Sequence, residues 1–333
     1  MRCLTCALAA AVAVTLVPAA AAAPLPNLVA VVNDTTVKTF RPDGSLAVTL
    51  TASGFASIGD TRLAIDGGSG GNDIVDVRDA RTGSPRYAIP NAFRGIVLPQ
   101  GQVAFWPGRN GVRDPLADSI WIRLRDGRIR KLLQLPGGED TLLSTSFDRT
   151  ARRLVVANGN DLDVFRYDVW LRDRTTAKTR RLTKDHHSRW PALRGDGKVV
   201  AYTHERGACA AGQHASDIVL LTLSTGKKRV LARGSCTRTY PQPVFLTNGT
   251  LISYRGRRVG GVWRFDLVRV ATATGRRTVV PGSAGAGVLS VSQPQRLLAF
   301  EGPNGVTIID RNLAAVRVMP NLSTPLLAGD LRN

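Results

Sequence analysis

RWPALRGDGKVVAYTHERG, residues 189–207, is the clearest copy of a repeating β unit in this 333-residue chain. A proline-led apolar run precedes a Gly-Asp-Gly turn, and the turn leads into VVAYT (199–203), whose β-branched and aromatic residues favour a strand. Weaker copies are QPVFLTNGTLISYRGRR (242–258) and VLSVSQPQRLLAFEGPNG (288–305). The 33 glycines and 18 prolines interrupt the chain throughout, which favours an all-β repeat protein over a helical one.

The strand that follows each turn can be aligned seven times along the chain. Its copies recur every 34 to 52 residues and are LVAVV (28–32), RLAID (62–66), QVAFW (102–106), RLVVA (153–157), VVAYT (199–203), LISYR (251–255) and LLAFE (297–301). A third strand, which often begins with an aspartate (Asp73, Asp118, Asp168, Asp217), and a basic fourth strand follow in each unit. Four strands at this period predict a β-propeller of seven four-stranded blades, with a six-bladed ring and one irregularly packed copy as the alternative.

The two ends of the chain complement each other. The first copy has no room for a first strand, and the closing STPLLAGD (323–330) has the pattern of a first strand without its blade. We therefore expect the segment near Leu326 to pair with the strand near Val29. Such pairing would close the ring and leave no open sheet edge.

Residues 180–207 together with SDIVLLTLSTGKKRVLA (216–232) resemble TolB-type β-propeller repeats. The matching positions are Leu182, Thr183, Pro191, Asp196, Gly197, Lys198, Tyr202, Asp217 and Ile218. The Ser-Pro usual in that family is replaced by Arg194-Gly195 in this chain, and the resemblance fades outside the fourth to sixth copies. The resemblance implies an exported WD40-like propeller. It does not select a function, because such repeats occur in envelope scaffolds, ligand binders and the lid domains of peptidases.

The N-terminus, MRCLTCALAAAVAVTLVPAAAAAP, has the charge, apolar run and small-residue cleavage site of a secretory signal. We predict a signal peptide over residues 1–22, a single propeller domain over 23–333, and a location in the periplasm, the cell wall or the medium. No later stretch approaches the ~20 apolar residues of a membrane span, so no transmembrane segment is expected after cleavage. A monomer is expected.

The formal net charge is +20. Such a charge is suited to nucleic acid, an anionic wall polymer or acidic lipid head groups, and export argues against nucleic acid. Basic fourth strands also have a structural explanation. A blade's last strand is its outer edge, and charge there discourages pairing with another molecule. We favour this explanation over a polyanion site.

Cysteine and histidine converge on one side of the predicted ring. Strand directions alternate, so the second-to-third-strand loops and the connections between blades share one face, termed the loop face. Cys209 and Cys236, the two of the four cysteines that would remain after signal cleavage, both fall there, and an exported protein is expected to join them in a disulfide.

The candidate ligand-binding residues on the loop face are His186, His187, His204, Glu205, His214, Asp161 and Asp163. The four histidines could hold a divalent metal, but their spacing matches no established ligand motif, and we favour the explanation that they lie in solvated polar loops. No cofactor is predicted. No nucleophile motif is present, so no catalytic residue is assigned.

Three functions are compatible with these features. The first is a non-enzymatic exported propeller that binds a protein, peptide or glycan of the cell envelope on its loop face. The second is a metal-assisted lyase or hydrolase that acts on an acidic saccharide. The third is an envelope scaffold held to anionic cell-wall polymer by charge.

Overall fold

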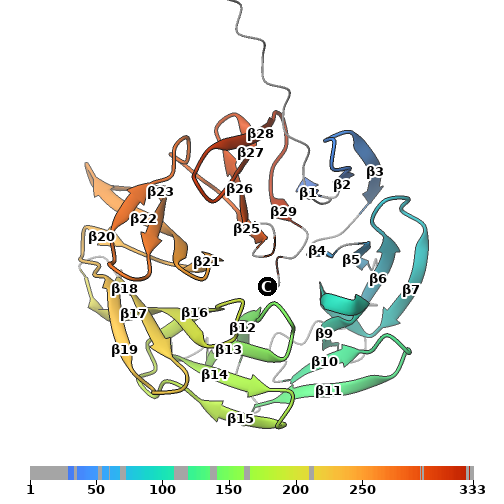
Figure 1. Ribbon diagram of the computed structural model, residues 1–333, viewed down its shortest axis with the longest axis horizontal. Helices are drawn as coiled ribbons and strands as arrows, with labels where there is room; N and C mark the ends of the chain where they lie inside the picture. The colour runs from blue at the N-terminus through green and yellow to red at the C-terminus, as the bar shows by residue number, and fades with distance from the viewer. Residues whose placement is uncertain are drawn as a thin grey trace, which may run out of the picture.

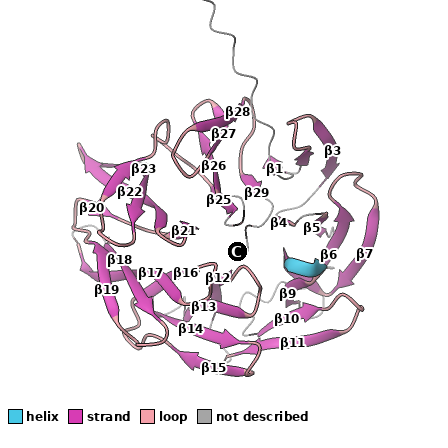
Figure 2. Cartoon of the chain, in the orientation of Figure 1, coloured by secondary structure: helices cyan, strands magenta, loops and turns pink. Residues whose placement is uncertain are grey.

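The strands of the chain form seven sheets arranged radially around one central axis (Figure 1). The computed structural model describes residues 29–33, 36–51, 55–59, 61–67, 73–108, 119–135, 141–160, 166–209, 214–292, 294, 296–327 and 330. Each of the seven aligned segments lies in a different sheet, and the only helix in the described residues is the 3-10 turn η1 (Pro99–Gly101; Figure 2). The predicted all-β propeller is confirmed. The proposed signal peptide lies outside the described residues.

Each sheet is antiparallel, with its strands ordered from the axis outward. The first three sheets are β29 (Pro325–Leu327), β1 (Val29–Asn33), β2 (Thr36–Phe40) and β3 (Leu46–Thr51); β4 (Ala56–Ile58), β5 (Arg62–Gly67), β6 (Ile74–Asp79) and β7 (Pro85–Pro90); and β8 (Ala92–Val97), β9 (Val103–Pro107), β10 (Ser119–Arg123) and β11 (Ile129–Gln134). The fourth and fifth sheets are β12 (Thr141–Phe147), β13 (Arg153–Asn160), β14 (Arg166–Asp173) and β15 (Lys178–Arg181); and β16 (Ser188–Leu193), β17 (Val199–Ala208), β18 (His214–Thr222) and β19 (Lys228–Ala232).

The sixth sheet has an interrupted inner strand. Its strands are β20 (Arg238–Thr239) and β21 (Val244–Thr247), which both pair with β22 (Thr250–Val259), followed by β23 (Val262–Ala271) and β24 (Arg277–Val279). The seventh sheet is β25 (Leu289–Ser292), β26 (Leu297–Gly302), β27 (Gly305–Ile309) and β28 (Ala315–Met319).

The ring is closed by strands from both ends of the chain. β29 pairs with β1 in the register Val29 with Leu327, Ala30 with Leu326 and Val31 with Pro325. The last described strand therefore completes the sheet that the first one begins, as predicted. In Figure 1 the two strands lie side by side, with β29 nearer the axis.

Hydrophobic packing between neighbouring sheets holds the ring together. The buried residues form clusters that each span one junction: Trp106 and Phe147 share the cluster between the third and fourth sheets. Phe40 and Leu327 pack with Met319 across the seam between the seventh sheet and the first. The seam is thus packed in the same way as an internal junction, because the repeat presents the same apolar faces there.

A serine hydroxyl links neighbouring inner strands at several junctions. In each case a serine on the inner strand of one sheet accepts a hydrogen bond from a backbone amide on the inner strand of the next. The pairs are Ser57 with Val97 at 3.1 Å, Ser146 with Leu193 at 3.0 Å and Ser290 with Leu327 at 2.8 Å. The third pair is at the seam. Inner strands of neighbouring sheets do not pair as a ladder, so these side chains satisfy amides that burial would otherwise leave without partners.

The basic fourth strands lie at the outer sheet edges, as expected. Several of their arginines also have a second role, because they reach across to the next sheet and donate to a backbone carbonyl in its third-to-fourth-strand turn. The pairs are Arg180 with Leu223 at 3.1 Å, Arg229 with Ala273 at 2.6 Å and Arg317 with Asp43 at 2.7 Å. Some of the arginines that give the chain its positive charge therefore link neighbouring sheets.

Candidate functional site

Two of the aspartates that begin the third strands, Asp168 and Asp217, have structural roles. Asp168 and Asp217 are 4% and 3% exposed. Asp217 accepts a hydrogen bond from the Gly234 amide at 2.8 Å and forms an ion pair with Arg206 at 3.0 Å. Burial of a carboxylate is tolerated when a cation and backbone donors surround it, so these aspartates fix the connection to the next sheet.

The disulfide between Cys209 and Cys236 is present, with the two Cα atoms 5.4 Å apart. It joins the loop after β17 to the connection that leads into β20. Its formation confirms that these two loop classes share one face of the ring.

The histidines of the loop face lie beside carboxylates. His186 has its Nδ1 3.0 Å from a carboxylate oxygen of Asp168, and His204 has its Nδ1 3.6 Å from Asp185. The carbonyl of His187 accepts a hydrogen bond from the Glu205 amide at 2.8 Å. The structure therefore brings His186, His187, His204 and Glu205 into one region between β14 and β17.

The other predicted ligand residues contribute less. Glu205 is buried and forms an ion pair with Arg189, whose guanidinium stacks 4.4 Å above the Trp190 ring. His214 begins β18, where its backbone pairs with Ala208. Asp161 and Asp163 lie outside the described residues. Within the part of the chain that the structure describes, no three His, Cys, Asp or Glu side chains gather as metal ligands. The binding role of this region stays a prediction.

A cavity opens on the opposite side of the ring, termed the turn face, which carries the first-to-second and third-to-fourth-strand turns. Its volume is about 440 Å³, and its lining comes from the turns of four successive sheets. The lining residues are Arg149, Gly195, Thr247, Asn248, Gly249, Thr250, Arg296, Arg311 and Asn312. We call it the arginine cavity. Because the first strands are innermost, their turns meet near the axis, and this brings Arg149 and Arg296 from separate repeats to one site.

The arginine cavity is positively charged. The described residues of its lining are three arginines, two asparagines, two threonines and two glycines, with no carboxylate among them. All three guanidinium groups belong to exposed residues, and none of them takes part in an ion pair among the described residues. Three uncompensated cations repel one another, so a bound anion would lower their electrostatic energy.

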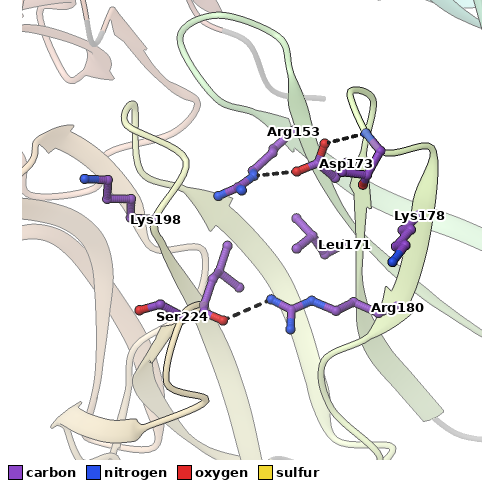
Figure 3. A pocket seen from close by; sticks show the side chains of 9 residues that line it. Arg153, Leu171, Asp173, Lys178, Arg180, Lys198 and Ser224 are labelled. Carbon is purple, nitrogen blue, oxygen red and sulfur yellow. Dashed lines mark hydrogen bonds and ion pairs between the residues drawn. The ribbon is translucent and has the colours of Figure 1, made fainter.

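A larger cavity of about 610 Å³ lies between the fourth and fifth sheets on the same face (Figure 3). It is also basic, but its two arginines already bind groups of the protein itself. Arg153 forms an ion pair with Asp173 at 3.0 Å and donates to the Gly197 carbonyl at 2.7 Å, and Arg180 donates to the carbonyl of Leu223. Its arginines hold the two sheets together, which makes the arginine cavity the better candidate for a ligand.

Comparison with known proteins identifies the fold. No family model and no curated protein matches the sequence. Among solved structures, the chain is similar to tricorn protease (TM-score 0.62, 14% identity, 90% of this chain and 34% of that chain) and to hydrazine synthase of Kuenenia stuttgartiensis (TM-score 0.61, 13% identity, 92% and 100%). It is also similar to a TolB structure from Agrobacterium tumefaciens (TM-score 0.50, 12% identity, 84% and 97%).

These similarities show that the chain has a β-propeller fold, which a TolB structure shares. The chain spans about a third of the length of tricorn protease. At such low identity, the shared feature is the fold alone, because functional residues on a propeller lie in loops that differ between its members. Within the described residues, no helix has the length and apolar character needed to span a bilayer.

Proposed function

We propose that this chain is an exported, non-enzymatic propeller that binds an anionic peptide or glycan of the cell envelope through the arginine cavity. The observation that carries the proposal is the convergence of Arg149, Arg296 and Arg311 on one cavity, with no carboxylate among the lining residues that the structure describes. The disulfide and the TolB-like fold support a location outside the cytoplasm.

The chemistry of the lining favours carboxylate or phosphate groups. A guanidinium group presents paired donors that fit both anions, and it stays charged at any physiological pH. The neighbouring Asn248, Thr250 and Asn312 offer neutral hydrogen-bonding groups that can contact the hydroxyl or amide groups of the same ligand. None of the described lining residues is an acid, a histidine or a cysteine, so these residues suit binding and include none of the usual general bases.

Binding is tested by titrating the oxidised full chain with a glutamate oligopeptide, a polyuronate oligosaccharide and inorganic phosphate by calorimetry. Arg149→Ser and Arg296→Ser should each weaken binding about tenfold or more, since a hydrogen bond to a charged group contributes about 1.5–3 kcal/mol. Arg81→Ser is the matched control, because Arg81 is an exposed arginine in another turn of the same face.

Two results would contradict the proposal. Equal weakening by Arg81→Ser and Arg149→Ser, with a steep loss of affinity in salt, would indicate binding by net charge and favour the scaffold function. Absence of binding to all three probes at low salt would remove the arginine cavity as a site.

A further inference from the structure

The hairpin formed by β22 and β23 carries exposed apolar residues that the propeller core does not use. Val259 and Val262 are 52% and 64% exposed, and Phe265 is 37% exposed. The two valines pair directly beside the tip, where Gly260 and Gly261 both have positive φ, as a tight hairpin turn requires. The tip is therefore a tight turn flanked by two apolar side chains that face solvent.

The hairpin is longer than that of the next sheet in the ring and about as long as that of the preceding sheet, where β17 and β18 have ten and nine residues. The strands β22 and β23 have ten residues each, whereas β26 and β27 of the next sheet have six and five. Residues 257–259 of β22 are exposed, whereas Gly256 is buried, although β20 still pairs with the strand at Arg257. The hairpin projects from the loop face, because it is a second-to-third-strand connection.

A row of arginines lies directly behind the apolar tip. Arg238 on β20 pairs with Arg257 on β22, and Arg257 pairs with Arg264 on β23, so the three side chains stand on the same face of the sheet. Like charges opposite one another destabilise a sheet unless a counter-charge is supplied. Arg257 is 3.3 Å from the buried Asp266, and no carboxylate lies in residues 251–265.

The spacing between the two exposed valines and the row of arginines fits a bilayer interface. Val259 and Val262 are two residues further along the strands than Arg257 and Arg264, which is about 7 Å. Interfacial elements bury their apolar side about 5–10 Å into the head-group boundary while cationic residues contact lipid phosphates. On the other face of the hairpin Trp263 and Phe265 stack with their ring centroids 6.2 Å apart, and such aromatic rings are typical of membrane interfaces.

Backbone hydrogen bonds join the hairpin to the segment 235–238 beside it. The Arg258 amide donates to the Thr237 carbonyl at 3.0 Å, and Ser235 and Arg238 exchange backbone hydrogen bonds. Cys236 lies between them and is fixed to Cys209 by the disulfide. The segment that supplies Arg238 is therefore tied to the neighbouring sheet, which keeps the arginine row in place.

We propose that the β22–β23 hairpin docks onto a membrane surface that contains anionic lipid. Val259 and Val262 enter the head-group boundary, and Arg238, Arg257 and Arg264 contact lipid phosphates. An acidic protein partner could satisfy the arginines, but it would not account for an apolar tip that projects beyond them. The hairpin is on the loop face and the arginine cavity on the turn face, so the docked protein would keep that cavity accessible.

The experiment is flotation of the oxidised full chain with vesicles of phosphatidylcholine alone or with one quarter phosphatidylglycerol. We expect binding only with phosphatidylglycerol. The double variant Val259→Ser/Val262→Ser should weaken it about tenfold, because two apolar side chains no longer leave water. The matched control is Val230→Ser/Val318→Ser, two valines that are 42% and 51% exposed on outer strands, and it should bind as the wild type does. All four valines are exposed, so the variants should fold, and the unfolding midpoint of each verifies this.

A second measurement locates the hairpin in the bilayer. Tryptophan fluorescence should be quenched by lipids brominated near the head group, and Trp263→Phe should abolish this quenching. Absence of binding to anionic vesicles would overturn the proposal. Equal binding by the two valine double variants, or binding of a glutamate peptide at the hairpin without binding to vesicles, would also overturn it.

Discussion

Ring closure can be tested at a single hydroxyl group. Ser290 is fully buried on β25, and its Oγ accepts a hydrogen bond from the Leu327 amide at 2.8 Å and donates one to Asp330 at 2.7 Å. Ser290→Ala would leave a buried amide at the seam without an acceptor, which costs about 1–3 kcal/mol of unfolding free energy. Ser146→Ala is the internal control, because Ser146 accepts from the Leu193 amide at 3.0 Å between two sheets far from the seam.

The two substitutions should differ once the closing strand is removed. A chain that ends at residue 324 lacks both Leu327 and Asp330, so Ser290→Ala should then cost close to nothing, while Ser146→Ala should keep its full effect. The truncation itself should cost about 2 kcal/mol or more, because Leu327 is 2% exposed and its side chain would no longer be buried. Urea unfolding monitored by circular dichroism gives each free energy from the midpoint and slope.

The closure argument fails if Ser290→Ala destabilises the truncated chain as much as the full chain. It also fails if truncation leaves the unfolding midpoint unchanged. Either result would mean that the contacts of Leu327 and Asp330 at the seam do not stabilise the ring in the way argued.

The remaining predictions concern the disulfide and a buried carboxyl. Removing the bond with Cys209→Ser/Cys236→Ser should lower the unfolding free energy by roughly 3–4 kcal/mol, the chain-entropy value for a loop of this length, and an unchanged urea midpoint would contradict this. Burial raises the pKa of Asp148 above its ordinary value of about 3.9, despite hydrogen bonds from the Arg153 and Arg152 amides and the Thr150 hydroxyl. The folded state therefore holds the Asp148 proton more tightly than the unfolded state, so its contribution to stability is present below pH 4 and is lost as pH rises through the folded pKa. Asp148→Asn should make the unfolding free energy decline less between pH 4 and 7, and parallel pH profiles for the two proteins would refute this.

The sequence predicted the parts of the fold that depend on local patterns. The alternation of turn and strand in VVAYT and its six counterparts is set within each repeat, because hairpin pairing depends on neighbouring residues. Closure by Leu326 and the bond between Cys209 and Cys236 followed from counting strands, since strand direction alone assigns each loop to a face.

Only the tertiary structure decided which charged residues are available to a ligand. Glu205 looks like a ligand residue in the sequence, yet burial against Arg189 makes it part of the scaffold. Arg149 and Arg296 are far apart along the chain, and nothing in their local sequence marks them. Their convergence arises because equivalent turns of successive sheets meet around the axis, and that meeting depends on how whole sheets pack against one another.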